Sequence, residues 1–295
     1  MSAPFPGAPP AAPAGGARFV DLHMHSTASD GALAPTAVVE AARAAGLAAI
    51  ALTDHDTVAG VPEAQAAGAR LGVRIVPGVE LSAHDGDREL HLLGLHLEDV
   101  EEVERRLTRF REMRHRRAEQ IVSRLNALGV PVTLAAVLAE AAGGAVGRPH
   151  VARALIAGKW VRDHREAFDR YLGFGRPAYV GKERLTSADA IRIVHEAGGV
   201  CVFAHPGQDG SRERVERLVA NGLDGLEIRH PSHSAEDVAR LGALVEHFRL
   251  VPSGGSDWHG QREGPRTIGM MQVPAEWLER QDARAAEVRA RTRVA

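Results

Sequence analysis

Short apolar runs alternate with alanine-rich helical stretches through most of this sequence. The runs ARFVDLHMH, LAAIALTDHD, VRIVPGVEL and RELHLLGLHL are typical of strands, and helices are expected between the first three, over 35–46 and 58–72. The rhythm returns late in the chain with the strands GGVCVFAHP, LDGLEIRHP and RLVPSGGSDWH and with helices over 187–196, 212–220 and 235–247. This alternation predicts parallel β/α units, and we expect them to form an α/β barrel.

The rhythm breaks between residues 99 and 184, where long helical patterns occur with almost no strand signal. We therefore predict a barrel domain formed by 18–98 and 185–295, with 99–184 inserted as a helical substrate cap. Residues 1–17 are rich in Pro, Ala and Gly and lack the basic and apolar segments of a signal peptide, so a disordered tail is expected. No apolar run is long enough for a transmembrane helix, and a cytoplasmic location is expected.

Composition excludes some classes of protein. Hydrophobic residues make up 44% of the chain and charged residues 25%, as in ordinary globular proteins, and the net charge of -2 gives no global basic signature for nucleic acid. The single cysteine, Cys201, can form neither an internal disulfide nor a cysteine-based zinc site. Its apolar surroundings predict a buried packing residue.

Histidines and carboxylates gather where the predicted strands end. His23 and His25 lie two residues apart, as do Asp257 and His259, so each pair faces one way on its strand. The carboxyl ends of parallel barrel strands converge on one face, where active sites lie. Nine candidate metal ligands are therefore expected there, with Glu80 ending the third strand and His91 within the fourth: His23, His25, Asp30, His55, Glu80, His91, His205, Asp257 and His259.

Bringing three acids together in a water-poor site without cations would be costly, so we expect bound metal. Imidazole and carboxylate donors suit Mn, Zn or Fe, and one site could take Mg. Nine ligands exceed the needs of one ion, which predicts two or three divalent ions that share a bridging carboxylate.

Five motifs resemble those of the PHP (polymerase and histidinol phosphatase) domain: DLHMHSTASDG, LTDHDTVAG, PGVELSA, FAHPG and GGSDWHG. With GRPHVARAL in the insertion, they are similar to stand-alone bacterial PHP phosphoesterases, including the ribonuclease AM type, that act on nucleotide 3′,5′-bisphosphates and short RNA. The resemblance covers about residues 18–275. It implies a distorted seven-stranded (β/α) barrel, in agreement with the strands expected above.

The resemblance also implies how the ions would be held, with manganese as the leading expectation. His23, His25, Glu80 and Asp257 would hold one ion, and Glu80 would bridge to a second held by His91 and His205. Asp30, His55 and His259 would hold a third. Asp30 stands where some relatives have histidine, so this site is expected to be weaker or to select another metal. We predict a catalytic role for His23, His25, Glu80, Asp257 and His259.

Substrate contacts are harder to assign. We predict Arg148, His150, Lys182, Arg229 and His230, with Arg176 and His233 as further candidates. Arg148 and His150 lie at the start of a predicted helix in the insertion. An arginine at this position can bind a phosphate group bidentately; the alternative is that Arg148 only faces water. The arginine run over 105–117 is better explained by a solvated helix with ion pairs than by an RNA-guiding surface. Asp21 could orient an imidazole or be solvated at its strand end, and of Asp54 and Asp56 one could support a ligand and the other cap the following helix.

The leading hypothesis is therefore a metal-dependent phosphoesterase. It would hydrolyse nucleotide 3′,5′-bisphosphates and, from the 5′ end, short oligoribonucleotides, by in-line attack of a metal-bridging hydroxide. A histidinol-phosphate-type phosphatase, a metal-dependent amidohydrolase and a metal-stabilised nucleic-acid-binding module are the alternatives. Amidohydrolases often need a carboxylated lysine, and neither Lys159 nor Lys182 ends an early strand. No obligate protein partner is expected.

Overall fold

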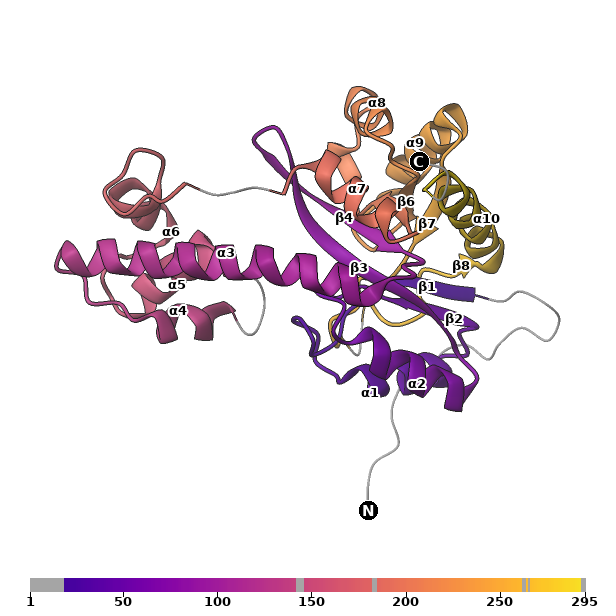
Figure 1. Ribbon diagram of the computed structural model, residues 1–295, viewed down its shortest axis with the longest axis horizontal. Helices are drawn as coiled ribbons and strands as arrows, with labels where there is room; N and C mark the ends of the chain where they lie inside the picture. The colour runs from indigo at the N-terminus through magenta and orange to yellow at the C-terminus, as the bar shows by residue number, and fades with distance from the viewer. Residues whose placement is uncertain (1–18, 142–145, 182–184, 262–263, 265, 293–295) are drawn as a thin grey trace, which may run out of the picture.

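The computed structural model describes residues 19–141, 146–181, 185–261, 264 and 266–292. A single sheet of eight strands forms its centre, in the order β7-β6-β5-β4-β3-β2-β1-β8 (Figure 1). The predicted tail over 1–17 lies outside the described residues. The strands are β1 (Phe19–Met24), β2 (Ala49–Leu52), β3 (Arg74–Asp85), β4 (Arg88–Leu95), β5 (Val200–Phe203), β6 (Gly225–Arg229), β7 (Val251–Gly254) and β8 (Val273–Pro274).

The two edges of the sheet meet at the end of β1. The Asp257 N–H donates to the His23 carbonyl at 2.9 Å, and the His25 N–H donates to the Trp258 carbonyl at 3.0 Å. The segment after β7 thus pairs with the end of β1, whereas β8 pairs antiparallel with its beginning. The sheet is nearly closed into a barrel, and the predicted α/β barrel fold is confirmed. We call the end of the barrel at which the parallel strands finish the barrel mouth.

The prediction that all strands are parallel is wrong for β4. This strand runs antiparallel to both β3 and β5. Only residues 86 and 87 separate β3 from β4, which leaves room for a hairpin but not for a crossover helix. Gly86 makes the turn with a φ of +61°, a conformation that favours glycine. Because β4 starts at the mouth, His91 in its first half lies beside the ends of the parallel strands.

Six helices pack around the sheet: α1 (Pro35–Ala44), α2 (Val61–Leu71), α7 (Ser187–Glu196), α8 (Arg212–Ala220), α9 (Ala235–Phe248) and α10 (Ala275–Thr292). Thr186, Ser211 and Ser234 cap α7, α8 and α9 by accepting a hydrogen bond from a backbone N–H of the first turn. The sequence predicted neither β8 nor α10. Leu278 and Ala285 of α10 complete a buried cluster to which seven of the strands contribute.

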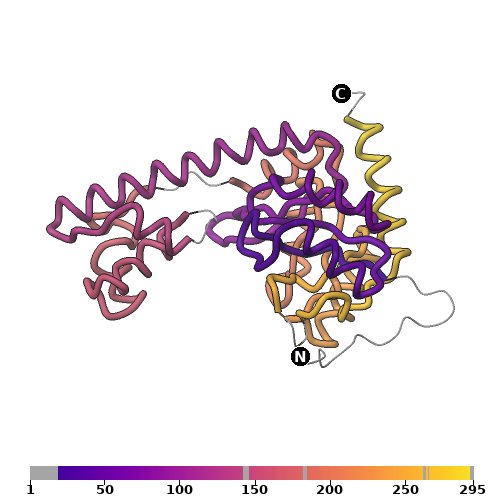
Figure 2. Tube along the Cα trace, turned by 90° about the horizontal axis from the view of Figure 1, so that it is seen from below, coloured from indigo at the N-terminus to yellow at the C-terminus, as the bar shows by residue number. Residues whose placement is uncertain are grey.

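The described part of the predicted insertion contains α3 (Val100–Ala127), α4 (Leu134–Ala141), α5 (Arg148–Ala157), α6 (His164–Ala167) and a π-helix, η1 (Phe168–Leu172). Asp99 caps α3 by accepting a hydrogen bond from the Glu102 N–H at 2.9 Å. Figures 1 and 2 show α3 leaving the sheet and extending away from it, with α4, α5 and α6 along its outer half. These helices share a hydrophobic core of their own, separate from the clusters of the barrel.

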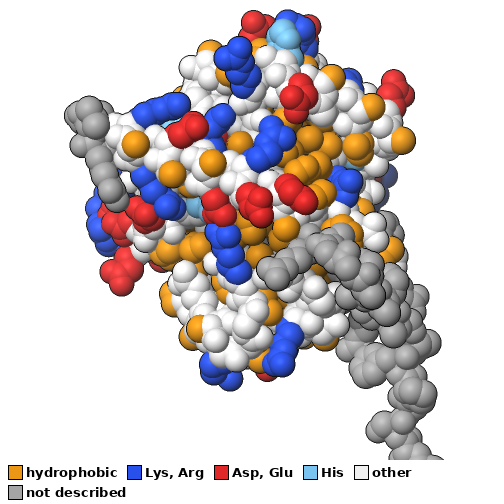
Figure 3. Space-filling model, turned by 90° about the vertical axis from the view of Figure 1, so that its right-hand side faces the viewer, with side chains coloured by type: hydrophobic (Ala, Val, Ile, Leu, Met, Phe, Trp, Pro, Cys, Tyr) orange, Lys and Arg blue, Asp and Glu red, His pale blue; other side chains and the backbone are white. Residues whose placement is uncertain are grey.

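Charged side chains of both signs are interspersed over the face shown in Figure 3, in keeping with the small net charge. Cys201 is buried in β5, and burial raises the pKa of its thiol, which agrees with the packing role predicted for it. Within the described ranges, no helix combines the length and apolar character needed to span a bilayer.

Candidate metal centre

Glu80 lies at the centre of a cluster of histidines in the barrel mouth. Its carboxylate, only 1% exposed, has five imidazole nitrogens around it. Oε2 lies 3.1 Å from His23 Nε2, 3.2 Å from His25 Nε2 and 3.2 Å from His55 Nδ1. Oε1 lies 2.7 Å from His91 Nδ1 and 2.9 Å from His205 Nε2. One carboxylate therefore faces five histidines from four segments of the chain, as a bridging ligand would.

The sequence suggested that Glu80 ends its strand, but Glu80 lies within β3. Pairing of β2 with β3 stops at Pro77, but β3 continues to Asp85 against β4. Beyond Pro77, a lone backbone bridge joins Glu80 to His55 in the segment after β2. The divergence of that segment from β3 opens the mouth beside Glu80.

Asp257 is the second carboxylate of the inner cluster. Its Oδ1 lies 3.5 Å from His23 Nε2 and 3.2 Å from His25 Nε2. Donor atoms of His23, His25, Glu80 and Asp257 all lie within 4.8 Å of one another. The backbone approaches very closely here, because a Cβ on Gly255 would lie 2.4 Å from the His23 Cβ. Only glycine fits at that position.

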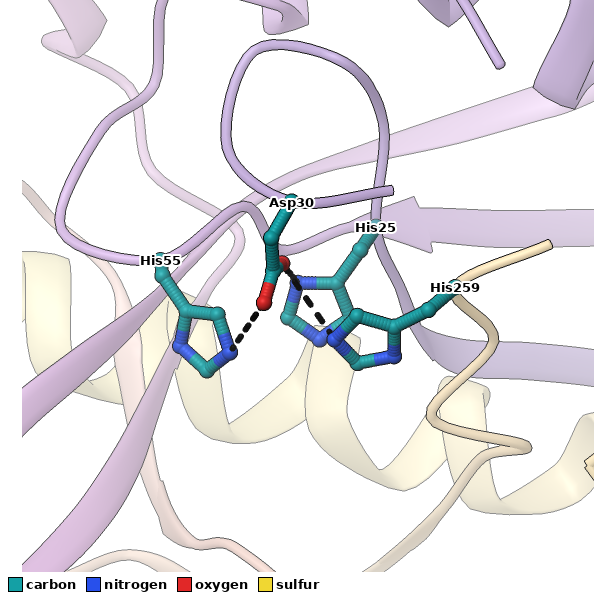
Figure 4. A group of neighbouring side chains, drawn as sticks. All are labelled: His25, Asp30, His55 and His259. Atoms are coloured by element: carbon teal, nitrogen blue, oxygen red, sulfur yellow. Dashed lines mark ion pairs between the residues drawn. The ribbon is translucent and has the colours of Figure 1, made fainter. Parts of the chain in front are cut away.

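A second group of four donors lies nearer to solvent: His25, Asp30, His55 and His259 (Figure 4). Asp30 Oδ1 lies 3.3 Å from His259 Nε2, and Asp30 Oδ2 lies 3.8 Å from His55 Nε2. The Asp30 side chain is 43% exposed, against 22% for His55 and His259. Asp54 shapes the loop that presents Asp30, since its carboxylate accepts hydrogen bonds from the Ser26 N–H and the Ser29 hydroxyl, each at 2.7 Å.

The electrostatics of the inner cluster require positive charge. Burial alone would raise the pKa of Glu80, but the neighbouring imidazoles, His23 and His91 foremost, hold that pKa well below its usual range. Burial disfavours the charged form of His25, yet the nearby carboxylates of Asp257 and Glu80 raise its pKa to about 9. Burial likewise opposes ionisation of Asp257, and His23, His230 and His25 outweigh it and lower the pKa. Divalent cations held between these carboxylates and imidazoles would supply that positive charge.

The donor set fits metal ions by its geometry and its chemistry. His25 is fully buried, and across the described residues neither of its ring nitrogens has a well-aligned hydrogen-bond partner. Buried polar atoms without partners are rare in folded proteins, and a ligand is one reason for them. Imidazole and carboxylate donors in this proportion suit Mn, Zn or Fe. The third donor group contains His55, Glu80 and His91, so His55 is within reach of two positions.

Glu227 supports the cluster and was missed by the sequence reasoning. It is fully buried in β6, with Oε1 3.1 Å from His23 Nδ1 and Oε2 accepting the His205 N–H at 2.6 Å. A histidine whose Nδ1–H donates to a carboxylate presents Nε2 to a metal. The signal in the sequence is a carboxylate between the apolar residues Leu226 and Ile228 of this strand. Asp21 has a comparable backbone role, since it accepts the Ser256 N–H at 2.9 Å, and burial raises its pKa to about 6.

Among the predicted substrate contacts from the barrel, only His230 faces the cluster. Its Nε2 lies 3.3 Å from Asp257 Oδ2 and its Nδ1 lies 2.7 Å from the Ser232 hydroxyl. Arg229 is directed elsewhere: it donates to the Met271 and Gln272 carbonyls, and its guanidinium lies 5.3 Å from the Trp277 ring. The pairing of β6 with β7 shifts register between Glu227 and Arg229, so Arg229 does not follow Glu227 toward the cluster although it lies two residues further along the chain. His233 serves the backbone, with Nε2 accepting the Gly207 N–H at 3.1 Å.

The predicted contacts in the insertion are also engaged within it. Arg148 donates to the Leu172 carbonyl at 3.0 Å and lies over the rings of Phe168 and Tyr179, at 5.5 and 5.3 Å. His150 accepts the Gly147 N–H at 2.8 Å, which caps α5. The Arg176 N–H donates to Gly173 in the turn that follows η1. Lys182 lies outside the described residues.

Two contacts beside the cluster were not foreseen. Arg266 pairs with the Asp257 carboxylate and also donates to its backbone carbonyl at 3.1 Å. Asp56, next to His55, accepts Arg114 of α3 at 2.8 Å and the Ser82 N–H at 2.9 Å. Asp56 does not cap the next helix, because α2 begins at Val61 with Gly60 as its cap. Most other arginines of the run form the predicted ion pairs with glutamates, such as Arg106 with Glu102.

Known proteins resemble this chain over most of its length. A family model for the PHP domain matches residues 21–178. A 3′,5′-nucleoside bisphosphate phosphatase from Chromobacterium violaceum is 38% identical over 257 residues, which cover 85% of this chain and 90% of that protein. A 5′-3′ exoribonuclease from Haemophilus influenzae is 36% identical, with 81% and 89% covered. The solved structure of a candidate metal-dependent phosphoesterase from Bifidobacterium adolescentis superposes with a TM-score of 0.69 at 32% identity, covering 94% of this chain and 97% of its own.

The barrel, the donor cluster and these similarities together define a metal-dependent phosphoesterase. The chain belongs to the PHP domain family. The family and the enzyme class expected from the motifs are thereby confirmed.

Proposed function

We propose that this phosphoesterase hydrolyses nucleotide 3′,5′-bisphosphates and removes nucleotides from the 5′ end of short oligoribonucleotides. The observation that carries the proposal is the single buried carboxylate of Glu80 facing five imidazoles, because phosphate ester hydrolysis needs concentrated positive charge at one point. The two relatives named above, a bisphosphate phosphatase and an exoribonuclease, support this substrate class.

The nine predicted ligands would hold two or three divalent ions, with manganese as the leading candidate. His23, His25, Glu80 and Asp257 would hold one, and Glu80 with His91 and His205 a second. Asp30, His55 and His259 would hold a third, whose exposed carboxylate suits a weaker or exchangeable ion. Bound ions of this kind neutralise phosphate charge and make water a nucleophile near neutral pH.

The side chains in and around the cluster would have separate roles in binding cations and substrate. Glu80 and Asp257 keep their negative charge because their pKa values are lowered, so both stay ready to bind cations. Burial lowers the pKa of His230 despite its contact with Asp257, so the neutral imidazole suits hydrogen bonding to substrate better than protonating a leaving group. Arg266 pairs with the Asp257 carboxylate, and we assign it to the phosphate oxygens in place of Arg229.

The test compares the hydrolysis of four substrates: nucleotide release from a 5′-phosphorylated oligoribonucleotide, and phosphate release from a nucleotide 3′,5′-bisphosphate, histidinol phosphate and an aryl phosphate. Each is assayed with Mn, Zn, Fe or Mg and with chelator. We expect the two nucleotide substrates to have the highest kcat/KM, and chelator to abolish turnover. A preference for histidinol phosphate would replace the proposal with the first alternative, and retention of activity in chelator would refute it.

A further inference from the structure

A basic pocket lies between α3 and the chain segment that returns from the insertion to the barrel. Arg117 Nε donates to the Val180 carbonyl at 3.0 Å, and Arg124 donates to the Tyr179 carbonyl, so α3 holds the returning segment along its side. The space between them is a pocket of about 330 Å³, within the size range of small-molecule sites. Its lining includes Arg114, Arg116, Arg117, Gln120, Val180 and Gly181.

The pocket carries positive charge. Three guanidinium groups line it, and among the described residues no carboxylate does. Arg114 pairs with Asp56, and Arg117 donates to the Val180 carbonyl. Arg116 is 72% exposed, and its ion pair with Glu112 is loose at 3.7 Å, so its charge remains available at the pocket. Guanidinium groups in this number suit phosphate oxygens.

The pocket adjoins the metal centre through Asp56. The backbone of Asp56 lies beside the cluster: its N–H donates to the Glu80 carbonyl at 2.8 Å, and Asp56 directly follows His55 in the chain. Its carboxylate accepts Arg114, which lines the pocket. An α-helix rises about 1.5 Å per residue, so Arg117 lies only about 4–5 Å further along α3 than Arg114. Asp56 and Arg114 thus connect the donor cluster to the pocket, and an oligonucleotide with one phosphate at the ions would follow this path with its next groups.

We infer that this pocket binds the phosphodiester backbone of an oligoribonucleotide beyond the nucleotide being removed. The inference rests on the proposed function and extends it, since the pocket lies outside the donor cluster and would add affinity only for substrates longer than one nucleotide. The second phosphate of a mononucleotide bisphosphate could also occupy the pocket. The experiment distinguishes this phosphate from the backbone phosphates of an oligoribonucleotide.

Arg116→Glu is the decisive variant, because the side chain is exposed and holds no other part of the fold. Arg165→Glu is a matched control: Arg165 is 91% exposed, belongs to the insertion and has the same kind of i,i+4 partner, Asp169, at the same 3.7 Å. Both variants reverse one charge, so any effect of net charge alone appears in both.

Initial rates are measured on 5′-phosphorylated oligoribonucleotides of two to six nucleotides and on a nucleotide 3′,5′-bisphosphate, over a range of salt. Arg116→Glu should raise KM for the longer oligonucleotides by about tenfold, leave kcat and bisphosphate hydrolysis within about twofold, and reduce the slope of log KM against log salt by about one. Arg165→Glu should match the unmodified protein on every substrate.

A second readout keeps this test independent of catalysis. Fluorescence anisotropy of a labelled five-nucleotide RNA in chelator should show weaker binding by Arg116→Glu than by Arg165→Glu. Equal binding by both, or oligonucleotide KM values that do not change, would overturn the inference. Equal losses on oligonucleotides and bisphosphate would overturn it too, by assigning the pocket to a mononucleotide phosphate. Failure of the unmodified protein to hydrolyse either substrate would instead refute the proposed function, and the anisotropy comparison would still decide whether the pocket binds RNA.

Discussion

Glu227→Gln should weaken metal binding by about ten- to a hundredfold without preventing folding. In the native protein, one oxygen of Glu227 lies 3.1 Å from His23 Nδ1 and the other accepts the His205 N–H. A glutamine has only one acceptor oxygen. The His205 backbone N–H is a fixed donor, so the amide oxygen must face it and the amide N–H must face His23. The His23 proton then moves from Nδ1 to Nε2, which is the nitrogen directed at Glu80.

A ten- to hundredfold change corresponds to about 1.4–2.7 kcal/mol of binding free energy. Competition with a chromophoric chelator measures it directly. Asp224→Asn provides a matched control, because Asp224 is also a buried carboxylate that contacts a histidine, His195 at 2.7 Å, and a backbone N–H, that of Cys201 at 2.9 Å. Both variants should lose about 1.5–3 kcal/mol of folding stability. Metal affinity that falls equally in both, or in neither, would refute the tautomer argument.

Three further predictions concern the cluster and the fold. Glu80→Gln should fold normally in chelator, judged by circular dichroism, and should lose most activity; near-normal turnover at full metal content would contradict a bridging role. Elemental analysis should find two or three ions per chain, reduced to a similar extent by His23→Ala and Asp257→Ala, and a saturating stoichiometry of one would be inconsistent with the cluster. Burial foremost lowers the pKa of His96 to about 4, so the unfolded chain binds an extra proton below pH 6.5. In chelator, stability should therefore fall by about 3 kcal/mol between pH 6.5 and pH 4, and denaturant titrations of His96→Asn should lack that part of the decline.

The sequence was most informative where the spacing of residues within a short motif determines which side chains lie on the same face. His23 and His25, two residues apart on a strand, must share a face, and the structure brings both within 3.2 Å of Glu80. Contacts between distant segments were beyond reach, since nothing near Glu227 indicates that its partner His23 lies 204 residues away. The direction of β4 could have been predicted, because the two residues between β3 and β4 permit only a hairpin. Arg229 is directed away from the cluster because the strand register shifts between Glu227 and Arg229, and nothing in the sequence indicates that shift.

The hydrogen bonds that join Asp257 to His23 have a consequence for biosynthesis. The histidines of β1 leave the ribosome among the first ordered residues, whereas Glu227 and Asp257 follow only after the insertion has been made. At 5–20 residues per second, the 204 residues between His23 and Glu227 take roughly 10–40 s to synthesise. Throughout that interval the group of His23, His25, Glu80 and Asp257 lacks its last member. Capture of an ion by this group therefore requires synthesis as far as Asp257, and a chain that terminates before that residue should leave the inner site empty.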